Sequence, residues 1–155
     1  MTNRRMWIFQ ANPKTYRLVD SLADASLEED VWKVTRYKRE ILSGHKGLIW
    51  KCGERKGIYA VVDVTSNVQR LPESPQASQY WVKDIDRNLT IDRVRIHRAL
   101  NRGTSLLLEE ELVRIPHFNV ENIFRNFRND TNFKVEGNER DIILELLNRR
   151  FGYVP

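Results

Sequence analysis

The residues best suited to chemistry in this chain are a tryptophan, Trp32, and the basic residues that follow it. Trp32 stands directly before Lys33, and Arg36, Lys38 and Arg39 come soon after. An indole ring can stack on a nucleic acid base, an interaction worth roughly 1–3 kcal/mol per base, while neighbouring lysines and arginines bind phosphates. This spacing predicts a base-binding position at Trp32 and phosphate contacts from Arg36, Lys38 and Arg39.

A second basic group lies where charged and apolar residues alternate. Arg93, Arg95 and His97 are separated by Val94 and Ile96. Residues two apart in a strand project from the same face, so the basic side chains share one face and the apolar ones share the other. Such a basic face is either an outer sheet surface with salt bridges or a groove wall that contacts a nucleic acid backbone.

The other three tryptophans divide between core and site. Trp7 lies in the apolar run MWIFQA and is expected in the core, where an indole usually donates one hydrogen bond. Trp50 and Trp81 lie in runs that fit a core strand as well as the lining of a pocket. Both therefore stay candidates for a pocket around Trp32.

Residues that catalyse reactions or bind metals are scattered. His45, His97 and His117 stand far apart, Cys52 is the only cysteine, and the chain has neither a glycine-rich phosphate loop nor a G-x-S-x-G motif. The acidic run 109–111 is typical of a solvated surface. We expect no catalytic residue, no metal and no cofactor. An enzyme that processes nucleic acids, such as a nuclease, is an alternative without a motif of its own.

Length and composition predict one intracellular domain with an anionic partner. A chain of 155 residues fits a single domain, here 1–155, and its net charge of +5 favours nucleic acids. No apolar stretch reaches the roughly 18 residues of a membrane helix, and one cysteine cannot form an internal disulfide. We expect a cytoplasmic protein with no membrane partner.

The elements that position these residues follow from hydrophobic periodicity and turn residues. Apolar and β-branched runs predict strands, which we place at 6–11, 47–52, 57–66, 79–83 and 92–100, with a loop at 71–77. Helical spacing predicts helices at 14–22 and 33–42, the second led by a capping box at 26–29.

Two further helices are expected after the N-caps Asn119 and Asn138, the first of them carrying Phe127. Residues 106–112 have a mixed pattern, and their state stays open. This order of strands and helices predicts an α+β domain, a curled sheet or small barrel with helices packed on it.

Taken in order, these residues resemble the EVE domain family of the PUA-like superfamily. The matching pieces are the strand with Trp7, Asn12-Pro13, the run 30–37 (DVWKVTRY), and Gly44 ahead of 48–50 (LIW) and 57–60 (GIYA). The resemblance covers residues 6–100 well and the final helices loosely. Family members commonly carry Gly-Asp where this chain has Gly44-His45, which affects a turn but none of the pocket positions.

The resemblance implies a PUA-like α+β fold, a curled mixed β-sheet or pseudo-barrel with flanking helices. EVE domains are similar to YTH domains, which hold a methylated adenine in an aromatic cage, and EVE members are implicated in recognising modified cytosine in DNA. Trp32 then matches a cage tryptophan, and Asn12 and Tyr16 match residues that read the edge of the base. The second cage wall of the relatives falls near 95–98, where this chain has no tryptophan, so either Trp50 or Trp81 replaces it or the pocket is more open.

The expected function is therefore a nucleic-acid-binding module that flips a modified base, 5-methylcytosine in DNA first, into an aromatic pocket. The expected pocket residues are Asn12, Tyr16, Trp32, Lys33, Trp50 and Trp81. The resemblance further implies a nuclease, a restriction subunit or a fused domain as partner. An RNA-binding accessory domain is the alternative, since related PUA-type domains bind RNA.

Overall fold

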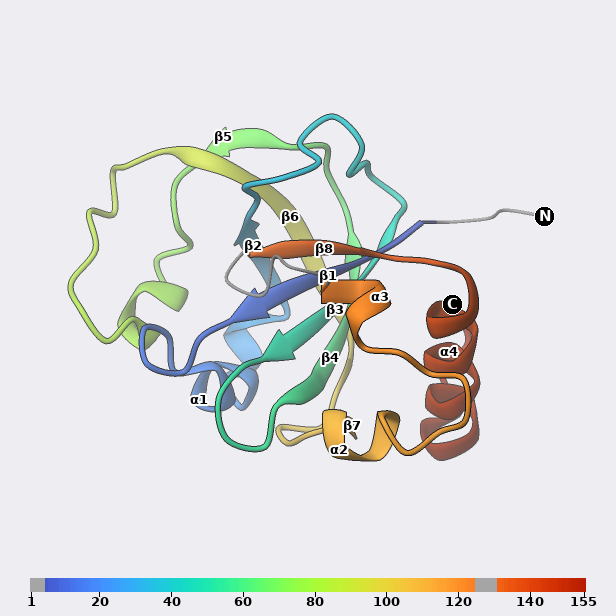
Figure 1. The fold of residues 1–155 in the computed structure, drawn as a ribbon. Helices are drawn as coiled ribbons and strands as arrows, with labels where there is room; N and C mark the ends of the chain where they lie inside the picture. The colour runs from blue at the N-terminus through green and yellow to red at the C-terminus, as the bar shows by residue number, and fades with distance from the viewer. Residues whose placement is uncertain (1–4, 125–130) are drawn as a thin grey trace.

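The computed structural model describes residues 5–124 and 131–155, and one mixed sheet runs through its centre (Figure 1). Its strands are β1 (Met6–Ala11), β2 (Glu29–Lys33), β3 (Lys46–Lys51), β4 (Gly57–Val64), β5 (Gln69–Leu71), β6 (Ile91–Asn101), β7 (Leu107–Leu108) and β8 (Asn132–Val135). The helical elements, with η for a 3₁₀ turn, are α1 (Leu18–Leu22), η1 (Ala25–Leu27), η2 (Ala77–Tyr80), α2 (Glu109–Leu112), α3 (Glu121–Phe124) and α4 (Gly137–Phe151).

The sheet has the order β2-β6-β4-β3-β1-β8, with β5 paired to β6 and β7 paired to β4. The neighbours β1 and β3 are parallel, and the other pairs are antiparallel. The sheet curls, with α3 and α4 on one side and α1 towards the other (Figure 1). The predicted α+β architecture, a curled mixed sheet with flanking helices, is confirmed.

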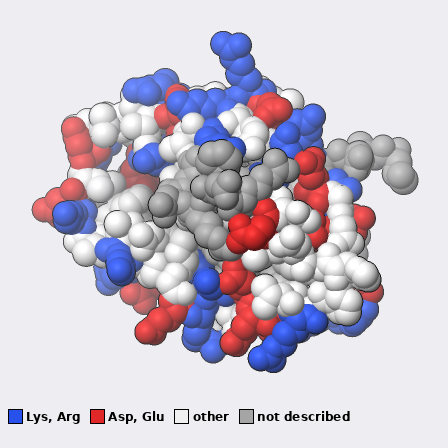
Figure 2. Space-filling model, in the orientation of Figure 1, with Lys and Arg blue, Asp and Glu red and all other residues white. Residues whose placement is uncertain are grey.

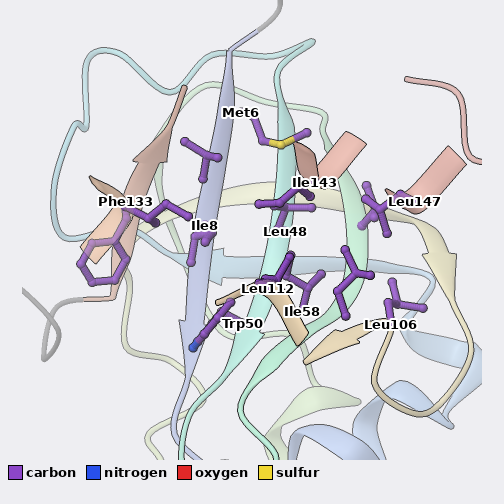
Figure 3. Close-up of a cluster of buried hydrophobic side chains, with 14 of the residues drawn as sticks. Met6, Ile8, Leu48, Trp50, Ile58, Leu106, Leu112, Phe133, Ile143 and Leu147 are labelled. Carbon is purple, nitrogen blue, oxygen red and sulfur yellow. The ribbon is translucent and has the colours of Figure 1, made fainter. Parts of the chain in front are cut away.

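Apolar side chains cover both faces of the central strands. Along β1, Met6 and Ile8 join a first core cluster that includes residues of α2, α3 and α4 (Figure 3). Trp7 and Phe9 alternate with them and join a second core cluster on the opposite face. Burial on both faces explains why β1, β3 and β4 have nearly continuous apolar sequences rather than alternating ones.

Gly47 in β3 leaves room for the second core cluster. A Cβ atom at this position would lie 2.6 Å from Phe9 Cε2 and 2.8 Å from Val62 Cγ2. Both neighbours are fully buried, so neither can move away without disturbing the core. We expect Gly47→Ala to lower the free energy of unfolding by roughly 1–3 kcal/mol, as measured by urea denaturation. A loss below about 0.5 kcal/mol, the usual effect of a surface substitution, would contradict this packing.

The segment before the predicted basic helix is a strand. Residues 29–33 form β2, so the capping box predicted at 26–29 is wrong. The side chain of Asp24 instead accepts a hydrogen bond from the Ser26 N–H and begins η1. Trp32 therefore lies within a strand and not at the start of a helix.

The chain between β2 and β3 is irregular, and the prediction of a helix over 33–42 is wrong. The side chain of Asn132, a fully buried residue of β8, binds this loop. Its Oδ1 accepts from the backbone N–H groups of Thr35 and Arg36, and its Nδ2 donates to the Arg36 carbonyl. Tyr37 follows in the left-handed region, with φ +58°. These long-range hydrogen bonds replace the helical ones that the local spacing favoured.

The region from 79 to 83 is not a strand either. η2 ends at Tyr80, and within 79–83 only Trp81 pairs, through an isolated antiparallel bridge to Tyr16. The helix predicted over 14–22 is confirmed only as α1, because Asn12 to Tyr16 forms a turn in which the Tyr16 N–H donates to the Asn12 carbonyl. The hairpin of β3 and β4 and the strand β6 are confirmed.

The C-terminal third contains the two predicted helices with changed limits. Asn119 Oδ1 accepts from the Glu121 N–H at the start of α3, as expected of an N-terminal cap, and Phe127 lies outside the described residues. α4 begins at Gly137, so Asn138 is inside the helix and not its cap. Residues 106–112 divide between β7 and α2. None of the helices in the described ranges is long and apolar enough to cross a membrane.

Candidate functional site

Three aromatic residues from separate parts of the chain come together beside the second core cluster. Tyr16 follows β1, Trp32 lies on β2 and Trp81 follows η2, and we call them the aromatic cluster. The Tyr16 ring centroid lies 6.0 Å from that of Trp32, edge to face, and 4.8 Å from that of Trp81. Tyr16 is 4% exposed, whereas both indoles are partly exposed. All three positions are among those that the sequence predicts.

Strand pairing determines the side of β2 from which Trp32 projects. Trp32 is in register with Val94 and Asp30 with Ile96 on the neighbouring β6. Paired residues of antiparallel strands share a face, and Val94 and Ile96 belong to the second core cluster. The Trp32 ring is therefore anchored on the core side of the sheet, next to Tyr16.

Trp81 is oriented by a carboxylate that the sequence analysis missed. Its Nε1–H donates to Glu73 Oε2 at 2.8 Å, and Glu73 Oε1 accepts from the Ser74 N–H at 2.8 Å. Glu73 is 8% exposed although it lies in the loop before η2. A glutamate between a proline and a serine is typical of a solvent-exposed loop, so no local signal indicated its role.

Ionisable groups are buried next to the aromatic cluster. Asp30 Oδ2 lies 3.4 Å from Arg98 Nη2, and Arg98 Nη1 donates to the Ser21 carbonyl at 2.7 Å. Burial, together with the charge of Glu73, raises the pKa of Asp30 to about 7, although the Val31 N–H and the charge of Arg98 act in the opposite direction. Burial likewise raises the pKa of Tyr16, so its phenol stays neutral at physiological pH. The site can thus offer aromatic faces and hydrogen-bonding groups in a poorly solvated setting.

The predicted edge-reading residue Asn12 and the predicted pocket residue Lys33 are both exposed. Asn12 Oδ1 accepts from the Lys14 N–H at 3.0 Å, which uses one side-chain acceptor to form the turn after β1. Lys33 lies on β2 in register with Arg93, on the face opposite to that of Trp32. Lys33 is thus outside the aromatic cluster, and a role for Asn12 at the base edge stays a prediction.

Trp50 does not belong to this site. It is 3% exposed and packs in the first core cluster (Figure 3). Its ring centroid lies 4.9 Å from that of Phe124. The alternation of side chains along β3 directs it to the opposite face of the sheet from the aromatic cluster. The prediction that Trp50 lines the pocket is therefore corrected. The second tryptophan of the aromatic cluster is Trp81, which contacts Tyr16 as Trp32 does.

The predicted basic face of β6 is also corrected. Arg93 is 7% exposed and its Nη1 donates to the Leu71 carbonyl at 2.6 Å, so its guanidinium is engaged inside the protein. His97 Nε2 lies 3.2 Å from Glu28 Oε1, and its Nδ1 lies 3.8 Å from Asp63 Oδ2. Such acidic surroundings repel a phosphate. Arg95 is exposed as predicted.

The basic residues of the loop after β2 differ in their contacts with other residues of the protein. Lys38 forms an ion pair with Asp92 at 2.7 Å, and the Arg36 guanidinium lies over the Tyr37 ring at 4.8 Å. Arg39 is exposed. On the face shown in Figure 2, positive and negative side chains are interspersed rather than gathered by sign.

The Gly44-His45 turn, where the chain differs from the family pattern, supports the core. His45 Nδ1 accepts from the Trp7 Nε1–H at 3.0 Å and from the Leu42 N–H at 3.2 Å. Both donors require an unprotonated Nδ1. Burial, with the nearby charge of Arg5, lowers the pKa of His45 below its ordinary value. The histidine thus acts as an acceptor, a role that an aspartate can also fill.

This arrangement predicts a loss of stability in mild acid. The unfolded chain binds a proton at His45 near pH 6.5, whereas the folded protein does so only at lower pH. Stability is therefore complete above pH 6.5 and falls as the pH decreases towards the folded pKa. Urea midpoints measured from pH 7.5 to 5.5 should fall less for His45→Asn, which keeps an uncharged acceptor, than for the wild type. Parallel curves would contradict this assignment.

A hollow that opens to solvent lies elsewhere on the molecule. It has a volume of about 340 Å³ and lies between the α1–η1 segment and the end of β6, where Arg98 and Asn101 line it. No ring of the aromatic cluster lines it. Within residues 5–124 and 131–155, no three His, Cys, Asp or Glu side chains gather to hold a metal ion.

The curled mixed sheet and its flanking helices define a PUA-like α+β domain. The EVE domain family model matches residues 5–146, which is most of the chain, and the protein belongs to this family. The predicted family is confirmed.

Solved structures share this fold at low sequence identity. A hypothetical protein from Leishmania major has a TM-score of 0.63 at 16% identity, covering 96% of this chain and 97% of that chain. Human THYN1, in complex with DNA containing 5-methylcytosine, has a TM-score of 0.60 at 12% identity, covering 92% and 96%. Rpa0253 from Rhodopseudomonas palustris has a TM-score of 0.59 at 11% identity and covers 92% of each chain. The comparison with curated proteins found no match.

Proposed function

We propose that this protein binds DNA and holds a modified cytosine at the aromatic cluster, with 5-methylcytosine as the first candidate. The observation that carries the proposal is that the Tyr16 ring contacts both Trp32 and Trp81 while both indoles keep part of their surface exposed. The complex of human THYN1, a structure of the same fold, with DNA containing 5-methylcytosine supports this choice of ligand.

In this proposal Trp32 and Trp81 are the two walls of the site, and Tyr16 is its buried back. Removing a base from a duplex costs a few kcal/mol, which stacking on two indoles can recover. The hydrogen bond from Trp81 to Glu73 makes Glu73 a positioning residue, because it holds the second indole. A methyl group adds roughly 0.8 kcal/mol on burial, equivalent to about fourfold in affinity.

Phosphate contacts would come from basic residues that are exposed and lie near β2. We select Lys33, which follows Trp32 in the chain, together with Arg95 on the paired strand and Arg39 in the loop after β2. Lys33 and Arg95 share the outer face of the β2–β6 pair, where a nucleic acid backbone could contact both. This set keeps Arg39 and Arg95 from the sequence prediction, adds Lys33, and leaves out Arg93 and His97 as well as Arg36 and Lys38, which contact Tyr37 and Asp92.

The test is a binding comparison at one salt concentration with one duplex sequence in several forms. The central cytosine is unmodified, methylated or hydroxymethylated. One further probe carries methylated adenine, and another is RNA. We expect at least about fourfold tighter binding of the methylated cytosine duplex than of the unmodified one. Equal affinity for all DNA forms would contradict the proposal, and tighter binding of the RNA would favour an RNA-binding domain.

A further inference from the structure

The loop 82–90, which connects Trp81 to β6, exposes two apolar side chains. Val82 is 56% exposed and Leu89 is 54% exposed. A single exposed apolar side chain is ordinary on a protein surface. This loop carries two such side chains and begins directly after Trp81, a residue of the proposed site. Loops on a rigid scaffold often carry binding residues, so these two side chains are candidates for a binding role.

Hydrogen bonds anchor this loop at both ends. The Val82 N–H donates to the Thr15 carbonyl at 3.0 Å, one residue before Tyr16. The Thr90 carbonyl accepts from Arg70 Nη2 at 2.8 Å, next to β6. The apolar side chains are therefore presented by an anchored backbone, and little ordering is required when they bind a partner.

The middle of the loop is a turn with balanced charge. The Asp86 carbonyl accepts from the Leu89 N–H at 3.2 Å, and Asp86 Oδ1 accepts from the Asn88 N–H at 2.9 Å. The exposed cations Lys83 and Arg87 are offset by the exposed anions Asp84 and Asp86. A loop without net charge has no particular affinity for phosphates, so its apolar side chains are its distinguishing feature.

We propose that Val82 and Leu89 form a wedge that enters a DNA duplex and fills the space left in the base stack when a base moves to the aromatic cluster. This inference rests on the proposed function. A flipped base leaves a gap bounded by the apolar faces of neighbouring base pairs, and apolar side chains are known to insert between base steps. Val82 directly follows Trp81 in the chain, so the wedge begins at the wall of the base site.

The proposal predicts a defect that depends on the form of the DNA. The test uses the full chain with the double substitution Val82→Ser and Leu89→Ser and three probes that contain 5-methylcytosine. These probes are a duplex in which the base is paired, the same strand alone, and a duplex in which the base is an unpaired bulge. Only the paired duplex develops a gap when the base is flipped.

We expect the double variant to bind the paired duplex at least about fivefold more weakly than the wild type and to bind the other two probes with nearly wild-type affinity. The dependence of affinity on salt should stay unchanged, because no charge is altered. Val113→Ser is the matched control, since Val113 is 49% exposed next to α2, outside the loop 82–90, and should have no effect on any probe.

Wild-type affinity of the double variant for the paired duplex would overturn the wedge, as would an equal loss on all three probes. These results differ from a failure of the proposed function, in which the wild type itself does not distinguish methylated from unmodified cytosine. Both substituted residues are largely exposed, so an unchanged urea midpoint verifies that the variant is folded.

Discussion

Replacing Trp32 with alanine is expected to weaken binding of a duplex containing 5-methylcytosine by roughly 5- to 150-fold, which corresponds to the loss of one stacked base. The substitution removes the indole that contacts Tyr16 but leaves the pairing of β2 with β6 intact. Preference for the methylated base should disappear together with the affinity. Fluorescence anisotropy with methylated and unmodified duplexes measures both effects.

Two further variants separate stacking from phosphate binding. Trp32→Phe keeps an aromatic face and should retain part of the affinity and of the preference for the methylated base. Arg39→Ala, at an exposed basic position, should weaken binding to all sequences alike and reduce the salt dependence. If Trp32→Ala is folded and binds the methylated duplex as tightly as the wild type, Trp32 is not the base-binding residue.

The second large effect is expected on stability, at the ion pair of Asp30 and Arg98. The side chains are 1% and 4% exposed, so removing one partner leaves the other buried without its counter-charge. We expect Arg98→Leu to lower the free energy of unfolding by roughly 3–5 kcal/mol at pH 8, where Asp30 is ionised in the wild type. Urea denaturation measures this loss, and a value below about 1 kcal/mol, typical of an exposed pair, would contradict the burial described here.

The cost of Arg98→Leu should also depend on pH. The pKa of Asp30 is about 7 in the folded protein, against an ordinary value of 3.8. Between these values the folded state holds a proton that the unfolded state has lost, so the contribution of Asp30 to stability falls as the pH rises through the folded pKa. Removing Arg98 raises that pKa further, and the variant should therefore lose more stability at pH 8 than at pH 5.5. A second substitution, Asp30→Asn, should restore part of the loss and remove this dependence.

Sequence periodicity was sufficient to predict the buried strands and the hairpin between neighbouring strands. The apolar run that forms β1, the hairpin of β3 and β4, and the alternation along β6 all correspond to observed elements. Tyr16, Trp32 and Trp81 were selected in part from a family resemblance, because nothing local relates three positions so far apart in the chain. Their contacts arise from the pairing of β2 with β6 and from the bridge between Tyr16 and Trp81.

The predictions failed where long-range hydrogen bonds outweigh local preference. The loop after β2 has helical spacing, yet the side chain of Asn132, almost a hundred residues away, binds its backbone. Trp50 was assigned to the pocket because an isolated strand does not reveal which of two buried faces a residue occupies. Glu73 was missed because its role depends on the indole of Trp81, which reaches it only in the folded chain.

The most direct test of base binding at the aromatic cluster is to observe the four indole N–H signals by NMR while a duplex containing 5-methylcytosine is added. Trp7 and Trp50 are buried in the two core clusters and are internal controls. We predict that the signals of Trp32 and Trp81 shift strongly with the methylated duplex and less with the unmodified one, while those of Trp7 and Trp50 stay in place. Unchanged Trp32 and Trp81 signals at saturating DNA would contradict the placement of the base at the aromatic cluster.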